Sequence, residues 1–168
     1  MQSPADRGDT GKSSPPVPEM VGATSAPFFI GPGTTTISLP MHPPTGPALL
    51  HQDPKHSEVT LQIENVTGDK AAPVFYIYLN VPAGDAPERY PELYAGSLAP
   101  FGLVGASRPD SEHGGNGLTF KLDVTALFAR LTALKGWDPK NLKVSFVPSD
   151  WDAPVPQVRV GRVSLYFS

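Results

Sequence analysis

The clearest structural signal in the sequence is a strict alternation of apolar and polar residues at positions 59–64. The apolar members are Val59, Leu61 and Ile63, and a polar residue follows each of them. Successive side chains of a β-strand point to opposite faces, so this pattern predicts a strand with one buried and one solvated face. Such a strand belongs in a sheet whose apolar face is covered by a second layer.

Proline and glycine restrict what the rest of the chain can form. The 168 residues include 21 prolines and 16 glycines. Proline removes a backbone donor and clashes with the preceding helical turn, so long helices are not expected at this density. Short strands joined by frequent turns fit the composition better.

Further runs rich in apolar, β-branched or aromatic residues predict the remaining strands. We expect strands at Thr34–Leu39, Val74–Asn80, Leu93–Leu98, Leu118–Leu122, Leu142–Val147 and Val158–Phe167, the last one bent near Gly161. One helix is expected, with Asp123 as its N-cap and Gly136 as its stop. The sequence therefore predicts an all-β fold, a two-sheet sandwich of jelly-roll or Greek-key type with seven or eight strands and one short helix.

Composition divides the chain into three segments. Residues 1–18 are mostly Asp, Gly, Ser and Pro and contain little to bury, so we expect a disordered leader that resembles an interdomain linker. Residues 19–57 are expected to form an extended lead-in strand and a loop, and residues 58–168 the β-sandwich. Within the sandwich, residues 99–117 form a long loop, and loops of this length are often functional.

Charge and residue usage exclude several classes of protein. The net charge of −3 is small and argues against a nucleic-acid-binding surface, which needs clustered Lys and Arg. No cysteine is present, which excludes disulfides and metal sites built on thiolates. No apolar run approaches the ~20 residues that span a bilayer, and we find no apolar core of a signal peptide at the N-terminus. These features do not determine the cellular compartment of the protein.

Three of the four histidines lie close together in a proline-rich stretch. His42, His51 and His56 follow Met41, a set of side chains that could bind a soft or borderline metal such as copper. The alternative, which we favour, is a solvated loop, because no pair of these residues has the spacing that places two imidazoles on one helical face. His113 lies in a similar polar loop and is interpreted in the same way.

Aromatic residues in loops are candidates for binding. Trp137, Trp151 and Tyr90 could form a platform for a carbohydrate, or they could cover the protein's own core. Phe101 lies in a Pro-Phe-Gly turn and either folds back into the domain or projects into a partner. We find no nucleophile motif of the G-x-S-x-G type, and the loop carboxylates match a solvated surface. The chain therefore holds no complete catalytic site that the sequence reveals.

Several motifs, read in order, are similar to one known family. They are FYIYLN at 75–80, ELYAGSLAPFG at 92–102, FKLDVTALFARL at 120–131, and the strand sequences at 142–150 and 158–167. Over about residues 19–168 the chain resembles the C-terminal domain of tyrosinases and polyphenol oxidases, which are type 3 copper enzymes. It departs from the family's strand motif at Val74 and Tyr76, where plant members have Lys and Asp.

The resemblance implies a role without catalysis in this chain. The family's copper pair requires six histidines on a helical bundle, so copper is expected in a tyrosinase-like catalytic domain, fused or separate, and no cofactor in this chain. In latent enzymes of the family the C-terminal domain covers the entrance to the dicopper site, often with one bulky side chain. By this resemblance Phe101 is the candidate plug, with Leu98 as the second choice. The alternatives are a free-standing carbohydrate-binding module and a small copper-handling protein.

Overall fold

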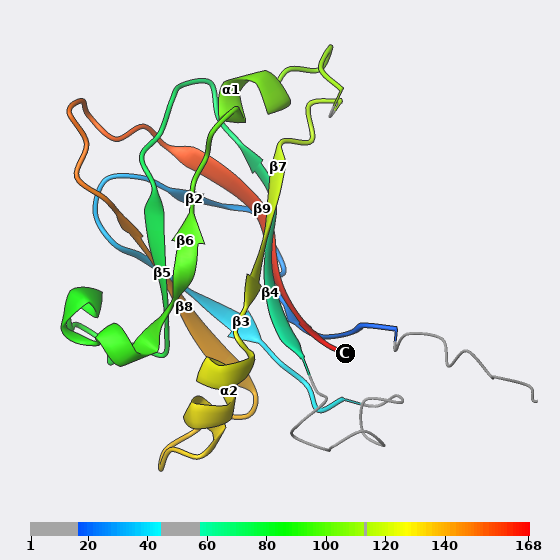
Figure 1. The fold of residues 1–168 in the computed structure, drawn as a ribbon, viewed down its shortest axis with the longest axis vertical. Helices are drawn as coiled ribbons and strands as arrows, with labels where there is room; N and C mark the ends of the chain where they lie inside the picture. Colours follow the sequence, from blue (N-terminus) through cyan, green and yellow to red (C-terminus); the bar gives the residue numbers. More distant parts are fainter. Residues whose placement is uncertain (1–16, 45–57, 113) are drawn as a thin grey trace, which may run out of the picture.

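The chain folds into two antiparallel sheets that lie face to face (Figure 1). The structure is a computed structural model, and it describes residues 17–44, 58–112 and 114–168. One sheet contains β1 (Glu19–Ala23), β2 (Phe28–Ile30), β4 (Val59–Thr67), β7 (Leu118–Asp123) and β9 (Val158–Phe167). The other contains β3 (Thr35–Pro40), β5 (Phe75–Leu79), β6 (Tyr94–Leu98) and β8 (Asn141–Pro148). The predicted all-β sandwich is confirmed.

Strand order brings distant parts of the sequence together. The first sheet runs β1-β9-β4-β7, with β2 also pairing with β9, and the second runs β3-β8-β5-β6. The central pair of the first sheet, β4 and β9, runs from Val59 opposite Phe167 to Thr67 opposite Arg159. Gly161, near which a bend was expected, lies inside the continuous strand β9, where an added Cβ would come within 2.7 Å of the Cβ of Asn65. Glycine therefore allows β9 to pass close to the irregular part of β4.

The buried face of each sheet follows the predicted alternation. Leu61 and Ile63 on β4 are fully buried, and so are Phe75, Ile77 and Leu79 on β5. These side chains belong to one hydrophobic core that both sheets share. Burying a large apolar side chain contributes about 1.5–3 kcal/mol, so this shared core holds the two layers together.

The structure contains more strands than the sequence predicted. Nine strands are present among the described residues, because β1 and β2 also pair with β9. The segment expected as a lead-in thus contributes β1, β2 and β3 to the two sheets. The disordered leader predicted for residues 1–18 lies almost wholly outside the described residues.

Two short helices lie at opposite ends of the sandwich (Figure 1). α1 (Leu103–Ala106) falls in the segment predicted as a long loop, and α2 (Thr125–Thr132) is the predicted helix, although it ends earlier than expected. Two 3-10 turns, η2 (Pro87–Arg89) and η3 (Pro91–Leu93), precede β6. In the part of the chain that the structure describes, no helix is long and apolar enough to cross a membrane.

The start of α2 differs from the prediction in one detail. Asp123 is the last residue of β7, and Val124 occupies the N-cap position without a side-chain cap. Asp123 still serves the helix, because its Oδ1 accepts hydrogen bonds from the backbone N–H of Thr125 (3.0 Å) and from the Thr125 hydroxyl (2.6 Å). These two bonds lower the pKa of Asp123 by stabilising the carboxylate.

Candidate functional site

The turn between β6 and α1 carries the most exposed aromatic side chain among the described residues. Phe101 is 84 % exposed. Its backbone N–H donates to the carbonyl oxygen of Ala99 (2.9 Å), and Gly102 has a φ of 76°. Glycine adopts this left-handed conformation without the penalty that a side chain would incur. The sequence of the turn thus favours a tight reversal with Phe101 at its outer tip.

Both ends of this turn are anchored in the domain. Leu98 is fully buried opposite Phe75, and Leu103 is also buried. The Ser107 hydroxyl donates to the carbonyl oxygen of Leu103 (2.6 Å) and accepts from the N–H of Gly68 (3.0 Å). Phe101 is therefore displayed on a supported turn. Leu98, the second candidate for a plug, points into the core and cannot reach a partner while the domain is folded.

An apolar groove of about 360 Å³ lies beside Phe101. Trp151, which is 45 % exposed, forms part of the same groove, although it comes from the loop between β8 and β9. We define the Phe101–Trp151 patch as Phe101, Trp151 and the groove residues Ala71, Val74 and Val104. None of the described residues that line the groove is charged. Soluble proteins rarely leave two aromatic side chains together at an apolar surface unless that surface contacts something.

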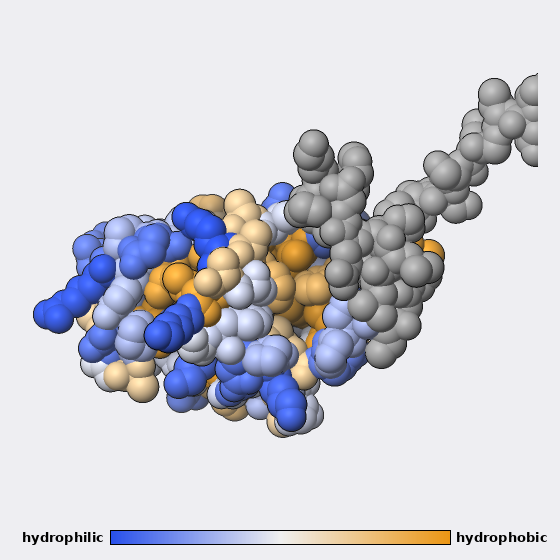
Figure 2. Space-filling model, turned by 90° about the horizontal axis from the view of Figure 1, so that it is seen from below, coloured by the Kyte–Doolittle hydropathy of each residue, from blue (hydrophilic) through white to orange (hydrophobic). Residues whose placement is uncertain are grey.

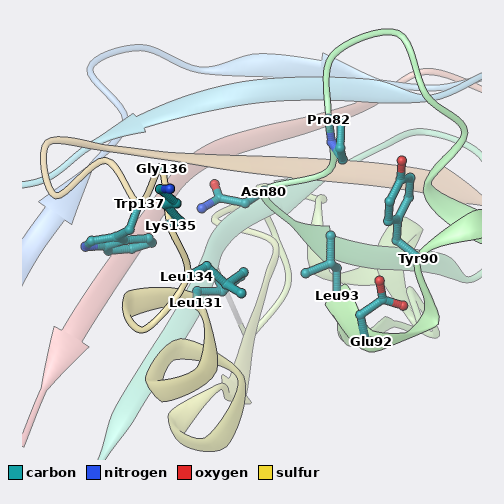
Figure 3. Close-up of a pocket in the computed structure, with 10 residues that line it drawn as sticks. All are labelled: Asn80, Pro82, Tyr90, Glu92, Leu93, Leu131, Leu134, Lys135, Gly136 and Trp137. Atoms are coloured by element: carbon teal, nitrogen blue, oxygen red, sulfur yellow. The ribbon is translucent and has the colours of Figure 1, made fainter.

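A second hollow, of about 380 Å³, lies at the α2 end (Figure 3). Leu131 and Leu134 come from α2 and the turn that follows it, with Tyr90 at one side of the hollow and Trp137 at the other. Trp137 packs edge-on against Phe128, with ring centroids 5.3 Å apart. These aromatic side chains are half-buried and support the protein's own surface.

Tyr90 is held by a hydrogen bond from its hydroxyl to Oδ2 of Asp85. This bond raises the pKa of Tyr90, because donation to a carboxylate favours the neutral phenol. Asp85 is one of the loop carboxylates expected on a solvated surface, and its position beside Tyr90 could not be read from the sequence.

The structure separates the three aromatic residues predicted as a carbohydrate platform. Tyr90 and Trp137 share the hollow at the α2 end, whereas Trp151 lies beside Phe101 at the α1 end. Sequence reasoning missed the pairing of Trp151 with Phe101, which are 50 positions apart. The only available signal was that both lie in proline-flanked loops.

Met41 and His42 do not form a metal site with other described residues. Met41 packs against the core, and the His42 ring Nδ1 lies 3.1 Å from the carbonyl oxygen of Pro43. His51, His56 and His113 lie outside the described residues. Within residues 17–44, 58–112 and 114–168, no three His, Cys, Asp or Glu side chains gather closely enough to hold an ion.

Comparisons with known proteins point to one family and to one kind of enzyme. The model of a protein family described as a domain of unknown function (DUF7868) matches residues 17–168. Tyrosinase HcTyr1 of Hahella sp. (strain CCB-MM4) is 32% identical over 158 residues, which is 92% of this chain and 34% of that protein. The chain thus spans about a third of the length of this curated relative, and the predicted resemblance to tyrosinases is confirmed over that part.

The matches among solved structures include two latent enzymes. Latent apple tyrosinase (MdPPO1) matches with a TM-score of 0.47 and 17% identity, over 87% of this chain and 27% of that chain. Recombinantly expressed latent aurone synthase (polyphenol oxidase) matches with a TM-score of 0.49 and 14% identity, over 80% of this chain and 24% of that chain.

Proposed function

Because the chain belongs to the family described as a domain of unknown function (DUF7868) and resembles part of a tyrosinase, we propose that it is a non-catalytic shielding domain. It covers the entrance to the dicopper site of a tyrosinase-like catalytic domain, fused or separate. The chain matches only about a third of tyrosinase HcTyr1. The unmatched remainder of that protein supports the existence of such a partner.

The chain's own residues do not fit a type 3 copper pair. The sequence has four histidines where the resemblance requires six, and no cysteine. His42, the histidine that the structure describes, lies beside a backbone carbonyl, and the described residues place no group of further ligands around it. The copper therefore belongs to the catalytic partner, and this chain acts by contact.

Phe101 is the plug in this proposal, and the observation that carries it is its 84 % exposure on an anchored turn. A ring that the domain leaves in water is free to enter a partner's cavity, and burying it there contributes about 1.5–3 kcal/mol. Trp151 and the groove would pack around the cavity rim and exclude water, as the surroundings of an interface anchor commonly do.

A tether makes this weak contact sufficient. A flexible linker holds two domains at an effective concentration on the order of millimolar, so a modest intrinsic affinity keeps the lid closed. Residues 1–18 have the composition expected of such a linker. Because the effective concentration is high, one aromatic anchor with a small apolar surround can be enough to keep the site covered.

The test is monophenol oxidation by a covalent or mixed assembly of this chain with a tyrosinase-like catalytic domain, using 4-methylphenol as the probe. Phe101→Ala removes the ring and leaves the turn glycine in place. We expect the latent activity to rise about 10-fold or more, which is the equilibrium shift that 1.5–3 kcal/mol produces.

Phe29→Ala is the matched control, because Phe29 is also an exposed phenylalanine but lies on β2. We expect this variant to stay latent. Unchanged latency in Phe101→Ala would show that Phe101 is not the plug. Equal activation by both variants would show that general loosening of the domain, rather than loss of the plug, opens the site.

A further inference from the structure

The α2 end of the sandwich carries a groove formed by two adjoining hollows. The first is the hollow beside Tyr90 and Trp137 (Figure 3). The second, of about 330 Å³, shares Asn80, Pro82 and Gly136 with it. We call the two together the α2-end groove.

One half of this groove is mostly apolar, with Glu92 and Lys135 as its charged members. Leu93, Leu131 and Leu134 line it, and Leu134 is more than half exposed. Figure 2, which shows the molecule from this end, has hydrophobic surface framed by hydrophilic groups. The Tyr90 hydroxyl is engaged by Asp85, so Tyr90 offers its ring to the hollow as a fixed wall. Preformed walls of this kind are typical of small-molecule sites.

The other half carries polar side chains with unused hydrogen-bonding capacity. Oδ1 of Asn80 accepts from the N–H of Lys143 (2.9 Å), and its Nδ2 group has no partner in the described part of the chain. Oδ1 of Asp138 accepts from the N–H of Lys140 (2.9 Å), which leaves Oδ2 for another donor. Amide and carboxylate groups in this state can bind several hydroxyls at once.

In the polar half, Asn141 gives the strongest indication of a ligand. Its Oδ1 atom is buried and has no hydrogen-bond partner among the described residues. An unpaired buried acceptor costs about 1–3 kcal/mol, so native structures rarely keep one without a reason. The Asn141 side chain borders the second hollow. Turning the amide toward a ligand donor would break no existing bond of Oδ1 and would form a new one.

From this arrangement we propose that the α2-end groove binds a pyranose ring of a neutral carbohydrate. The C–H face of the sugar lies against Tyr90 and the leucines, and its hydroxyls bind Asn80, Asp138 and Asn141. A simple phenol offers one hydroxyl and would leave most of these groups unused. An anion is disfavoured because Asp138 and Glu92 oppose the lysines at the groove.

Other aromatic surfaces of the domain suit a sugar less well. Tyr76, Tyr78 and Tyr94 lie together on the second sheet, but Tyr94 is inclined at 61–62° to each of the other two rings. A sugar ring therefore finds no shared plane across them. The Phe101–Trp151 patch has aromatic side chains but no charged or amide group in its groove.

The site is independent of the proposed shielding function, because the α2-end groove and the Phe101–Trp151 patch lie at opposite ends of the sandwich (Figure 1). A domain with both surfaces could contact an oxidase at one end and a glycan at the other. Loss of either function leaves the other measurable.

The experiment uses the full chain and three neutral probes, cellohexaose, xylohexaose and mannohexaose. Binding is followed by saturation-transfer NMR and by the fluorescence of Trp137 in a Trp151→Phe background. We expect saturable binding of at least one oligosaccharide, and Tyr90→Ala and Asn141→Ala each to weaken it about 10-fold, the effect of losing about 1.4 kcal/mol. Tyr90→Phe, which keeps the ring, should retain binding within about 3-fold.

Trp151→Ala is the matched control, since it removes an aromatic side chain from the other end, and it should bind the oligosaccharide as the parent chain does. Thermal unfolding of each variant separates loss of binding from loss of fold. No binding of any probe at about 10 mM, or equal binding by Asn141→Ala and the parent chain, would overturn the proposal. Saturable binding of 4-methylphenol in the groove without oligosaccharide binding would also overturn it, in favour of a phenol site.

Discussion

The α1 and α2 ends of the sandwich use similar residues in opposite ways. At the α2 end, Trp137 packs on Phe128 and Tyr90 is bonded to Asp85. At the α1 end, Phe101 and Trp151 make no ring contact within the described residues, and Phe101 is largely exposed while Trp151 is about half exposed. One end supports its aromatic side chains with its own structure, whereas the other presents them to solvent.

The lengths of the two helices explain this difference. α2 has eight residues, buries Leu127 and Leu131 against the sheets, and places Phe128 beneath Trp137. α1 has only four residues and supplies no further aromatic side chain. A single turn of helix is too short to cover the loops around it, so the apolar surface at the α1 end is available to another protein.

We expect the largest difference in the free energy of unfolding between variants of two residues at the α1 end, Leu98 and Phe101. Leu98→Ala leaves a cavity in the shared core and is expected to lower the free energy of unfolding by about 2–5 kcal/mol. Phe101→Ala removes a solvated ring and should change it by no more than about 0.5 kcal/mol. Urea unfolding of both variants measures the contrast. Comparable losses would mean that Phe101 packs into the domain and that the α1 end is not open.

Glycine substitutions test the backbone at the two ends. Gly117, near α1, has a φ of 79°, and a Cβ there would lie 2.0 Å from the carbonyl oxygen of Val66. Gly136, after α2, has a φ of 90° and open space around it. Gly136→Ala should cost about 1–2 kcal/mol for the left-handed backbone alone, and Gly117→Ala should cost more because β4 must move. Thermal unfolding ranks the two, and the reverse order would contradict the close contact at Gly117.

Asp123→Ala tests what supports the α2 end. Loss of the two hydrogen bonds to Thr125 should cost about 1 kcal/mol at neutral pH. Because the folded-state pKa of Asp123 is lowered, its contribution is present above the ordinary pKa of 3.8 and is lost as the pH falls through the folded value. Urea unfolding should therefore show a smaller difference between variant and parent at about pH 2 than at about pH 7. An equal difference at both pH values would rule out the charged carboxylate as the source.

The smallest effect is expected within the first sheet, at the ion pair of Glu64 on β4 and Arg162 on β9. Arg162 Nε lies 2.7 Å from Glu64 Oε2, and the Ser164 hydroxyl donates to the same oxygen (2.8 Å). The bond from Arg162 lowers the pKa of Glu64 more than partial burial raises it. The pair therefore stabilises the fold above the ordinary pKa of 4.5 and loses that effect as the pH falls through the folded value.

Glu64→Gln should thus cost less than about 1 kcal/mol at neutral pH, because Arg162 is partly exposed. NMR titration of the Glu64 carboxyl in an Arg162→Met variant should show its pKa move upward. An unchanged pKa would show that Arg162 is not the cause of the shift.

The segment around Phe101 shows how much of the candidate site the sequence could predict. The Pro-Phe-Gly turn identified Phe101 as a residue that either folds back or projects, and the family resemblance marked it as a plug. The same reasoning kept Leu98 as a second candidate, although it faces the core. One alternative grouped Trp151 with Tyr90 and Trp137 as a carbohydrate platform, and the structure places Trp151 at the other end.

The sequence by itself determined the strands β3 to β9, the buried face of β4 and the location of α2, because these follow from local periodicity and local backbone preferences. Only the tertiary structure decided that β1 and β2 pair with β9, that Phe101 and Trp151 share one groove, and that Asn141 borders another. These relations join residues far apart in the chain, and their free energy comes from contacts that exist only after both sheets have formed.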